Sequence, residues 1–553
     1  MGFIDKWPEY ERFKAGDQWP APTPKTKNLP RPVFNIIRQI EAHKVSSILN
    51  ENIRMVFSPE EINEEPNEDT LSPSDLFTRN ADATWENIKQ SKLNEEALEN
   101  GSNRGTCIWH YYWDTSVEGG TSLKWIGDMR GEVIDPMNYF PGNPQCREVE
   151  KQPYNIITKR GLVEDVRQEA RDNGLKEELL KMIKADKETQ NEGYNSAKVE
   201  LDGSDKVTVI IKYWRDKKTG LIWFIKVASG IVLKEPTNTE MSRYPIALMQ
   251  YEKREKSIFG IGDTEGLIPN QKAINYLMAM QLLSVQNTGW PKLVYKKNAI
   301  NPRLITNTPG EMIEDQSAGD GINVRYLNPG NISSVAQMLT DKFIEYTEKM
   351  TGAYDVARGE KPGGQLNATA IMLLQKAAGI PIEGIRRRFY QAMEDIGLIW
   401  MEFWKVKYNL PRFITIKNDE SKEYSTRFLG TDYKDINFNL RIDIGPASSY
   451  SESLMMSSLD NFLNQKYITF DMYLKYVPKN VVPFKERLLK EIDQTKQREA
   501  MMAQLLQQNK IMMEMFKKLP AHVQQDLLSQ VQQQPQEIPP NELLQQPMNE
   551  EVV

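Results

Sequence analysis

Two long helical patterns joined by a glycine-rich loop constrain the fold of this chain more than any other feature. The loop begins at Thr351 and reads TGAYDVARGEKPGGQLNATA. Apolar residues recur at helical spacing before it, up to Met350, and after it, to about Tyr408. An earlier helical pattern at 264–289 is separated from these by a compact segment, 290–332, with short strand patterns and many turn residues. Any fold for this chain must accommodate the order helix, small β insertion, helix, loop and long helix.

The first half of the chain mixes helix and strand patterns. Apolar residues at 33–49 have helical spacing, and we expect Ser72 or Ser74 to begin a second helix of roughly 25 residues that Gly101 caps. Aromatic and β-branched residues dominate the following run, TCIWHYYW, and the segment 206–234 has the pattern of β-hairpins. These patterns predict an α+β domain.

Three other segments differ in composition. Residues 1–31 are rich in proline, and we expect them to form an extended arm. Gly379 and Pro381 interrupt the long helical pattern, which predicts a kink. After that helix, two strand patterns precede a Met-rich helical region. The end of the chain, 521–553, is rich in glutamine and proline, which predicts disorder.

Length and charge exclude several classes of protein. The 553 residues are too many for one hydrophobic core, so we expect several domains. No apolar run approaches the roughly 20 residues that a membrane span needs. The N-terminus, MGFIDK, shows neither a signal-peptide pattern nor the Ser/Thr of a myristoylation site. The net charge of −6 argues against wrapping on nucleic acid, but it is compatible with a protein past which DNA slides.

Residues that usually carry catalysis or bind metals are scarce. The two cysteines, Cys107 and Cys146, do not predict a disulfide framework. With three histidines in the whole chain, a zinc site or a histidine-based catalytic pair has few candidates. We expect His43, His110 and His522 to be structural or surface residues, and we expect no catalytic residue, no metal and no cofactor.

Two glycine-rich segments lack the spacing of nucleotide-binding loops. In GEKPGG the lysine precedes the glycines, and Gln365 stands where a Walker A loop needs lysine. GIGDTEG lacks the full spacing of a dinucleotide loop, and a proline follows early in the predicted helix. Neither segment predicts a phosphate cradle.

The order of parts and four local stretches resemble bacteriophage portal proteins over nearly the whole chain. The stretches are NIIRQIEAHKVSSILNENIRMVFSP, DPMNYFPGNP, SIFGIGDTEGLIPNQKAIN and TGAYDVARGE…NATAIMLLQKAA. Portal proteins form rings, usually of twelve subunits, at one capsid vertex, and DNA passes through the central channel. The resemblance implies a portal-like α+β fold with these parts: an N-terminal arm, 1–31; a wing, 32–260, continued by 410–447; stem helices, 261–289 and 333–352; a clip, 290–332; a tunnel loop, 353–368; a long kinked helix, 369–409; a helical crown, 448–520; and the tail, 521–553.

The resemblance also assigns contacts to two of these parts. The tunnel loop would reach toward DNA, with Arg358 and Lys361 as transient phosphate contacts and Gly359, Gly363 and Gly364 keeping it mobile. The alternative is a helix–helix linker whose two charges face solvent. The clip would face the packaging motor and later the neck or tail. Its basic residues would contact a terminase or an adaptor, or DNA near the exit, unless they form an ordinary solubilising patch. Those residues are Lys292, Lys296, Lys297 and Arg303.

A conduit rather than an enzyme is the function that the resemblance implies, because the ATPase of DNA packaging is a separate terminase. The implied partners are further copies of this chain, double-stranded DNA, the terminase large subunit, neck and tail adaptors, the major capsid protein and, where one exists, a scaffold protein. The implied location is the portal vertex of the virion, and the host cytoplasm during assembly. Two alternatives stay open: another ring-forming neck or tail adaptor, and a nucleic-acid-processing enzyme without a recognisable active site.

Overall fold

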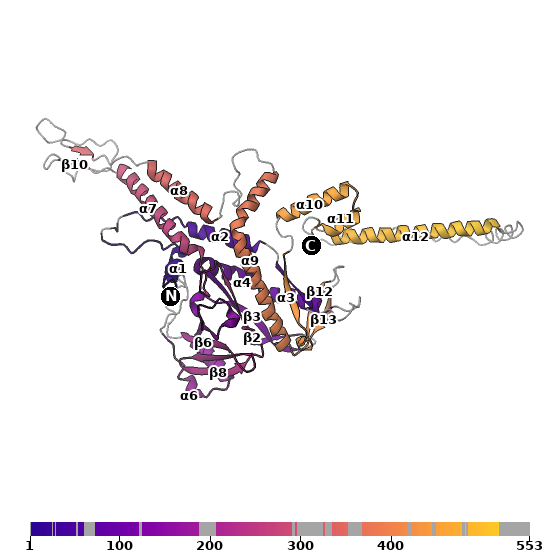
Figure 1. Ribbon diagram of the computed structural model, residues 1–553, viewed down its shortest axis with the longest axis horizontal. Helices are drawn as coiled ribbons and strands as arrows, with labels where there is room; N and C mark the ends of the chain where they lie inside the picture. The colour runs from indigo at the N-terminus through magenta and orange to yellow at the C-terminus, as the bar shows by residue number, and fades with distance from the viewer. Residues whose placement is uncertain are drawn as a thin grey trace, which may run out of the picture. The chain divides into compact units, whose positions relative to one another are not determined.

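The chain divides into two units, which are described separately. The first comprises Met1–Asn418 and Lys422–Ser451, and the second comprises Asp419–Ser421 and Glu452–Val553. The first unit contains both helices and sheets, which confirms the predicted α+β class (Figure 1). The computed structural model describes residues 2–24, 26–27, 29–50, 53–59, 72–120, 124–186, 206–289, 293–295, 324–326, 334–351, 368–417, 423–444, 449–477, 482 and 485–518.

The first unit has nine α-helices within these residues, excluding α10 at its border, and fourteen strands. The helices are α1 (Trp7–Ala15), α2 (Ile36–Leu49), α3 (Pro73–Asn87), α4 (Gln90–Arg104), α5 (Val163–Asp172), α6 (Glu177–Leu180), α7 (Asp263–Gly289), α8 (Ser334–Thr351) and α9 (Ala368–Lys407). The strands are β1 (Ile53–Pro59), β2 (Thr106–Gly119), β3 (Trp125–Val133), β4 (Tyr139–Pro141), β5 (Tyr154–Leu162), β6 (Lys206–Arg215), β7 (Ile222–Ala228), β8 (Ile231–Asn238), β9 (Ile246–Gln250), β10 (Leu293–Tyr295), β11 (Val324–Tyr326), β12 (Arg412–Lys417), β13 (Glu423–Phe428) and β14 (Phe438–Ile444).

Strand β2 separates two hydrophobic cores because both of its faces are buried. It pairs antiparallel with β3 on one side and β9 on the other. Cys107, Trp109 and Tyr111 belong to one core, whereas Ile108 belongs to the other. Successive side chains of a strand point to opposite faces, so a strand buried on both sides needs apolar residues at consecutive positions. The run TCIWHYYW meets this need.

A five-stranded sheet holds much of the second core. Its order is β4-β5-β6-β7-β8, and every neighbouring pair is antiparallel. The pairs β6–β7 and β7–β8 confirm the β-hairpins predicted for 206–234. Helix α5 packs beside this sheet through Val163, Val166 and Ala170, which are buried.

Helix α9 supplies one wall of the first core. Five of its buried residues follow helical spacing. The aromatic ones among them contact rings of α3 and β2, and the Phe77 and Trp404 ring centroids are 5.8 Å apart. Arg388 fixes α9 to the end of β9 by donating to the carbonyl of Tyr251 at 2.5 Å. Helix α9 lies against β9, and in Figure 1 it runs past the sheet that β2, β3 and β9 form. The buried stripe comprises Phe389, Met393, Ile396, Trp400 and Trp404.

The predicted extended arm at 1–31 is wrong over its first half. Helix α1 occupies Trp7–Ala15, and Gly16 ends it with φ +92°. Trp7, Tyr10 and Phe13 are fully or almost fully buried in the second core. The prolines at 8, 20, 22 and 24 suggested extension, but Pro8 lies in the first turn of a helix, where its missing N–H costs nothing.

The predicted single helix from Ser72 or Ser74 to Gly101 is also wrong, although Ser72 does cap its start by accepting from the amide of Asp75. Two helices, α3 and α4, occupy the segment, and the chain turns at Lys89 with φ +55°. Helix α4 continues past Gly101 and ends at Gly105, whose φ is +86°. Gly101 packs against Cys107 and Tyr251 instead, where a side chain would collide.

Three strands of the described chain follow α9, and one of them pairs with a strand from the early part of the chain. Strand β14, within the predicted pattern FNLRIDIGPAS, pairs with β1 near the N-terminus. Strand β12 corresponds to the predicted RFITIK and pairs with β13, which the sequence did not predict because EYSTRF is largely polar.

The second unit is helical in its described residues, as the sequence predicts for 448–520. Its helices are α10 (Ser449–Asn464), which begins in the first unit, α11 (Phe470–Tyr476) and α12 (Lys485–Lys518). An ion pair between Lys496 and Asp471 at 2.6 Å joins α12 to α11. Within the described part of the whole chain, no helix has the length and apolar content of a membrane span.

Candidate functional site

The residues predicted to contact DNA and partner proteins lie outside the described part of the chain. Arg358 and Lys361, with Gly359, Gly363 and Gly364, belong to the segment between α8 and α9. The predicted clip has only β10 and β11 described, so its four basic residues, Lys292, Lys296, Lys297 and Arg303, also lie outside. The elements that carry both segments are described, and they form the candidate functional site.

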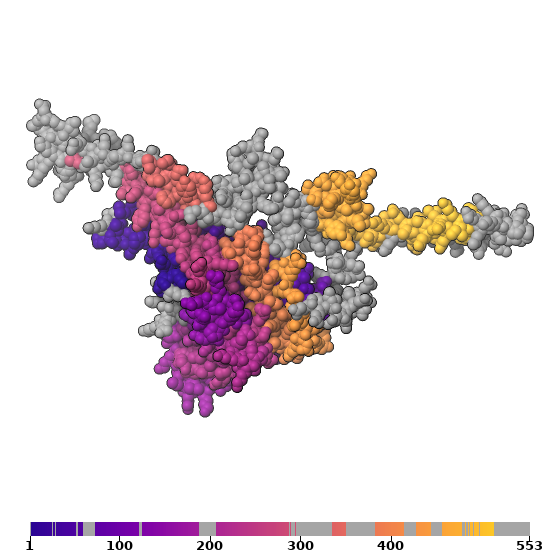
Figure 2. Space-filling model, viewed as in Figure 1, coloured from indigo at the N-terminus to yellow at the C-terminus, as the bar shows by residue number. Residues whose placement is uncertain are grey.

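Helices α7 and α8 form an antiparallel pair. Asn270 near the start of α7 donates to Thr347 near the end of α8, and Gln281 of α7 donates to Thr340, both at 3.1 Å. The two threonines are seven residues apart, so they lie on one face of α8. Figure 2 shows α7 and α8 side by side as pink and salmon surfaces. The sequence predicted both helices within a few residues of their ends.

The two described strands of the predicted clip, β10 near its start and β11 near its end, lie next to each other. Strand β10 pairs antiparallel with β11, so Leu293 lies opposite Tyr326 and Tyr295 opposite Val324. The chain therefore leaves α7 and returns to α8 through a two-stranded ribbon. The predicted tunnel loop, 353–368, follows α8, which ends at Thr351, and reaches the first residue of α9, Ala368.

The α7–α8 pair exposes apolar side chains and has few charges on α7. Between residues 273 and 289, α7 reads AINYLMAMQLLSVQNTG and contains no Asp, Glu, Lys or Arg. A soluble monomer rarely leaves many large apolar residues exposed on adjacent helices, and such surfaces usually mark contacts with partners. The exposed residues are Tyr276, Met280, Leu282, Val285, Val335, Met338, Leu339 and Tyr346.

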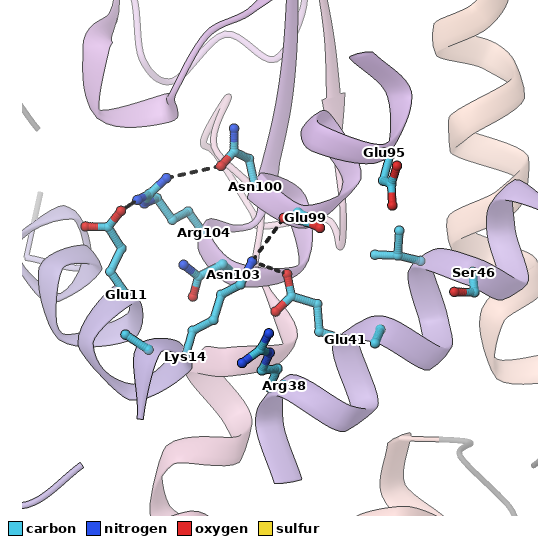
Figure 3. Close-up of a pocket in the computed structure, with 13 residues that line it drawn as sticks. Glu11, Lys14, Arg38, Glu41, Ser46, Glu95, Glu99, Asn100, Asn103 and Arg104 are labelled. Atoms are coloured by element: carbon cyan, nitrogen blue, oxygen red, sulfur yellow. Dashed lines mark hydrogen bonds and ion pairs between the residues drawn. The ribbon is translucent and has the colours of Figure 1, made fainter. Parts of the chain in front are cut away.

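The N-terminal helix α1 docks beside α7 and also lines a polar pocket. The pocket, of about 550 Å³, lies between α1, α2 and α4 (Figure 3). Lys14 of α1 points into it and contacts Glu41 of α2 at 2.6 Å and Glu99 of α4 at 3.5 Å. Arg104 of α4 is buried and pairs with Glu11 of α1 and with Asp135. Basic residues of α1 and α4 are thus paired with acidic residues of α1, α2 and α4 in this pocket.

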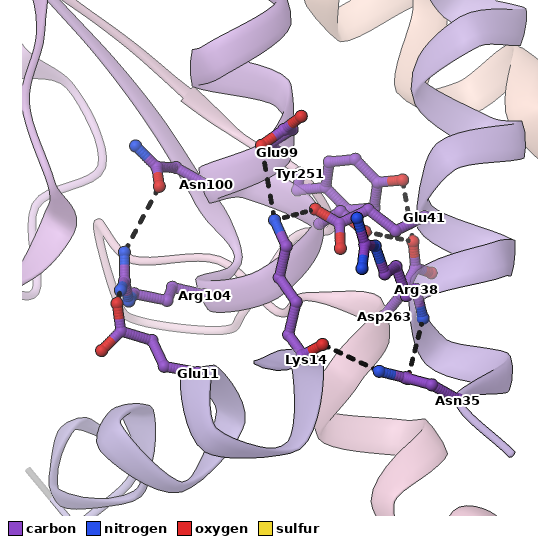
Figure 4. A network of polar contacts seen from close by, with 11 residues as sticks. Glu11, Lys14, Asn35, Arg38, Glu41, Glu99, Asn100, Arg104, Tyr251 and Asp263 are labelled. Atoms are coloured by element: carbon purple, nitrogen blue, oxygen red, sulfur yellow. Dashed lines mark hydrogen bonds and ion pairs between the residues drawn. The ribbon is translucent and has the colours of Figure 1, made fainter. Parts of the chain in front are cut away.

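Burial changes the acidity of the central carboxylate in this network. Glu41 is almost fully buried, and this burial raises its pKa to about 7, although Lys14 acts in the opposite direction. The carboxylates of Glu99 and Asp263 nearby raise it further. Figure 4 shows Glu41 between Lys14 and the start of α7. The network therefore holds a carboxyl group that titrates near neutral pH.

Asp263 joins the first turn of α7 to three other elements. Its carboxylate accepts from Lys44 of α2 at 2.5 Å, from Ser102 of α4 at 3.1 Å and from Tyr251 after β9 at 2.8 Å. Figure 4 shows Tyr251 and Asp263 joined by this last contact. The position is favourable because the N-terminus of a helix stabilises negative charge. Lys44 and Asp263 are both buried, so removing either would leave an uncompensated charge. This network fixes the direction in which α7 leaves the body.

Two glycines of GIGDTEG, Gly260 and Gly262, allow close packing at the start of α7. A Cβ on Gly260 would lie 2.2 Å from the carbonyl oxygen of Gly105, and one on Gly262 would lie 2.5 Å from that of Ser102. Backbone therefore meets backbone where β9, α4 and α7 join. This agrees with the absence of a dinucleotide loop in the sequence analysis.

His110 is a structural residue. Its ring nitrogens contact Glu132 at 2.5 Å and the hydroxyl of Tyr213 at 2.9 Å, and burial lowers its pKa. Burial alone would raise the pKa of Glu132, but the contacts with His110 and Lys159 lower it to about 2. Both histidine nitrogens are engaged, which leaves none to activate a nucleophile. Among the described residues, no cluster of three or more His, Cys, Asp or Glu side chains is arranged to hold a metal ion.

The sequence analysis missed the amide side chains that attach the N-terminal segment to α7. Gln271 and Asn275, one turn apart on α7, bond to Phe34 and Gln18 respectively. Their i, i+4 spacing was visible in the sequence, but their partners lie more than 230 residues away. Polar residues on a helix are usually solvated, so nothing local distinguished these two.

A comparison with known protein families matches most of the chain. A family model described as phage SU10 portal protein matches residues 121–550. The match covers the five-stranded sheet, the α7–α8 pair, the segment before α9, α9 itself and the helices of the second unit. No curated protein matches the chain.

Proposed function

The chain belongs to the phage SU10 portal protein family, and from this premise we propose that its copies form a ring around a channel for double-stranded DNA. A portal protein is a structural component of the phage capsid. The observation that best supports a ring is the α7–α8 pair, which leaves apolar residues of both helices exposed in the isolated chain. A ring of identical subunits needs two different, complementary surfaces on each subunit. Twelve subunits is the number we propose.

The α7–α8 pair serves as the stem of the ring in this proposal, and the segment after α8 serves as the tunnel loop. Duplex DNA carries one charge per ~1.7 Å of its axis, so a strongly basic channel would retain it by many counterion-releasing contacts. The acidic chain and the 17-residue stretch of α7 without Asp, Glu, Lys or Arg fit a channel that does not retain DNA. Arg358 and Lys361 would then make brief contacts with phosphates, repeated around the ring.

The segment bounded by β10 and β11 serves as the clip, which docks the terminase large subunit during packaging and neck or tail proteins afterwards. Lys292, Lys296, Lys297 and Arg303 supply the charge for that docking. The energy for translocation comes from the terminase, and this chain acts as a conduit. Assembly takes place in the host cytoplasm, with the major capsid protein and any scaffold as further partners.

The tunnel-loop proposal is tested by the double variant Arg358→Ala/Lys361→Ala. We expect rings of normal size and a several-fold loss of packaged or retained DNA, because the phosphate contacts are gone while the stem is intact. DNA protected from nuclease in assembled heads is the measurement. The double variant Lys217→Ala/Lys218→Ala, in the exposed turn between β6 and β7, removes the same charge elsewhere and should package normally.

Normal packaging by the tunnel-loop variant would contradict the DNA contacts and leave that segment as a simple linker between two helices.

The clip proposal is tested in the same assay with Lys296→Ala/Lys297→Ala, followed by terminase binding to purified rings. Unchanged terminase binding would contradict the role of these lysines. A chain that hydrolyses nucleotide without terminase would favour the alternative of a nucleic-acid-processing enzyme.

A further inference from the structure

A cavity of about 600 Å³ lies inside the first unit, and the proposed function gives it no role. Its walls come from one face of the five-stranded sheet, from α5, from β2 and from the last turns of α9. This volume is within the range of pockets that enclose small molecules. The lining residues that bear on a ligand are Phe224, Lys226, Lys234, Phe403 and Lys407.

Two lysines face each other across neighbouring strands in this cavity. Lys226 of β7 lies directly opposite Lys234 of β8 in the antiparallel register. Like charges at directly opposite positions destabilise a sheet. Glu169 of α5 forms an ion pair with Lys226 and offsets one of the two charges. Lys234 forms no ion pair with any described residue, and its ammonium nitrogen lies 5.1 Å from the ring centroid of Phe224.

Helix α9 brings a third lysine to the same cavity. Lys407 is the last residue of α9 and follows Phe403 by one turn, and both residues line the cavity. The C-terminus of a helix stabilises positive charge, which favours a cation at this position. Within the part of the chain that the structure describes, Lys407 forms no ion pair either.

Positive charge is in excess around Lys234. Burial lowers the pKa of this lysine, and the charges of Lys226 and Lys407 lower it further, while the carboxylate of Glu169 acts in the opposite direction. Three ammonium groups therefore lie near one carboxylate, which leaves two positive charges uncompensated. An anion that carries two negative charges would cancel this excess.

The other charged residues of the cavity do not supply that anion. Lys159 is paired with Glu132, and Arg160 is paired with Asp186. Three further carboxylates line the cavity, but in the described chain none forms an ion pair with a lysine of β8 or α9. They are Asp114, Asp165 and Asp172. The uncompensated charge is therefore local to the three lysines.

We propose that this cavity binds a phosphomonoester, with its phosphate group between Lys234 and Lys407. Such a phosphate carries about −1.5 to −2 charges at pH 7, which matches the local excess. Lysine binds phosphate as a point charge and needs no fixed fork geometry. The cavity is larger than a phosphate group, so it also has room for the organic part of the ligand. All the lining residues belong to one chain, so the site is independent of the proposed ring.

Calorimetric titration of the full chain with ribose 5-phosphate tests the site. We expect one molecule to bind per chain, because one cavity holds the three lysines. Ribose should not bind, and inorganic phosphate should bind more weakly, because the phosphate supplies the charge and the sugar supplies further contacts. Titration with AMP distinguishes two sources of the phosphate: tighter binding of AMP assigns the cavity to nucleotides, and weaker binding assigns it to sugar phosphates.

The variant Lys234→Gln tests the role of the uncompensated lysine. It should weaken the binding of ribose 5-phosphate about tenfold or more, because a charge-assisted hydrogen bond is lost. The substitution also removes the repulsion from Lys226, so we expect the melting temperature to equal or exceed that of the wild type. Loss of binding in this variant then cannot be ascribed to unfolding.

The matched control is Lys212→Gln on β6. The ammonium of Lys212 also lies over an aromatic ring, 4.9 Å from the centroid of Tyr154. Successive residues of a strand point to opposite faces, and Ile211 and Tyr213 line the cavity, so Lys212 lies on the other face of the sheet. This variant loses the same charge from the same sheet and should bind ribose 5-phosphate as the wild type does.

Acylation of lysines provides a second readout. A bound phosphate favours the protonated form of Lys234, so an amine-reactive ester should modify this lysine more slowly when ribose 5-phosphate is present. Modification of Lys212, measured by mass spectrometry of the same peptides, should not change. Absence of binding, equal affinity of the wild type and Lys234→Gln, or equal acylation of Lys234 with and without ligand would each overturn the proposal. None of these results bears on the ring, which electron microscopy tests separately.

Discussion

The residues at the base of α7 have structural roles: they allow close packing and hold the helix by hydrogen bonds. Gly260 and Gly262 permit backbone contact with α4, while Asp263 collects hydrogen bonds from three elements. The motif GIGDTEG is therefore the anchor of a helix, although its composition resembles a phosphate-binding loop.

Replacing Gly260 tests this anchor. In Gly260→Ala the new methyl group would lie 2.2 Å from the Gly105 carbonyl oxygen and 2.6 Å from that of Glu252, so backbone must move. We expect a loss of more than about 2 kcal/mol in the free energy of unfolding. Gly266→Ala, in the first turns of α7 with open space around it, is the control and should gain up to about 1 kcal/mol. Equal melting temperatures for both variants would refute the packing argument.

Glu41 makes the stability of the first unit depend on pH. Burial raises its pKa to about 7 in the folded chain, above the ordinary value of 4.5, so folding favours the protonated form. Stability from this group is complete below about pH 4.5 and is lost as pH rises to about 7. Relative to Glu41→Gln, the wild type should lose about 2 kcal/mol between pH 5 and pH 8. Urea unfolding of both proteins measures this, and parallel pH curves would contradict it.

At the scale of elements, the sequence predicted the helices and strands whose residue pattern is regular over a continuous stretch of chain. Helical spacing placed α7, α8 and α9, and hairpin signals placed β6, β7 and β8, because each pattern extends over many residues. Helix α1 was missed because the prolines of residues 1–31 outweighed its three buried aromatic residues. The break between α3 and α4 was missed because Lys89, an ordinary residue, adopts a left-handed conformation there.

The candidate site was less predictable than the fold. Exposed apolar residues on α7 and α8 have the same spacing as core residues, so the sequence cannot tell a covered face from an open one. The amide bonds from Gln271 and Asn275 depend on a segment that lies more than 230 residues earlier. Long-range pairing of this kind appears only when the chain is folded.

At the scale of the whole molecule, the central claim is that many copies share surfaces that one copy leaves exposed. The α7–α8 pair emerges from a body with two well-packed cores, and its base is held by Asp263 and the adjoining glycines. A rigid base and apolar sides suit a subunit that stands beside identical neighbours. In the proposed ring, the segment predicted as the tunnel loop would follow α8 in every copy.

Electron microscopy of the purified protein, with end-on views sorted into classes, tests this claim most directly. The account predicts closed rings with a central opening wide enough for duplex DNA, and twelve subunits in the commonest class. A closed oligomer without an open channel would contradict it, because DNA would have no path through such a particle.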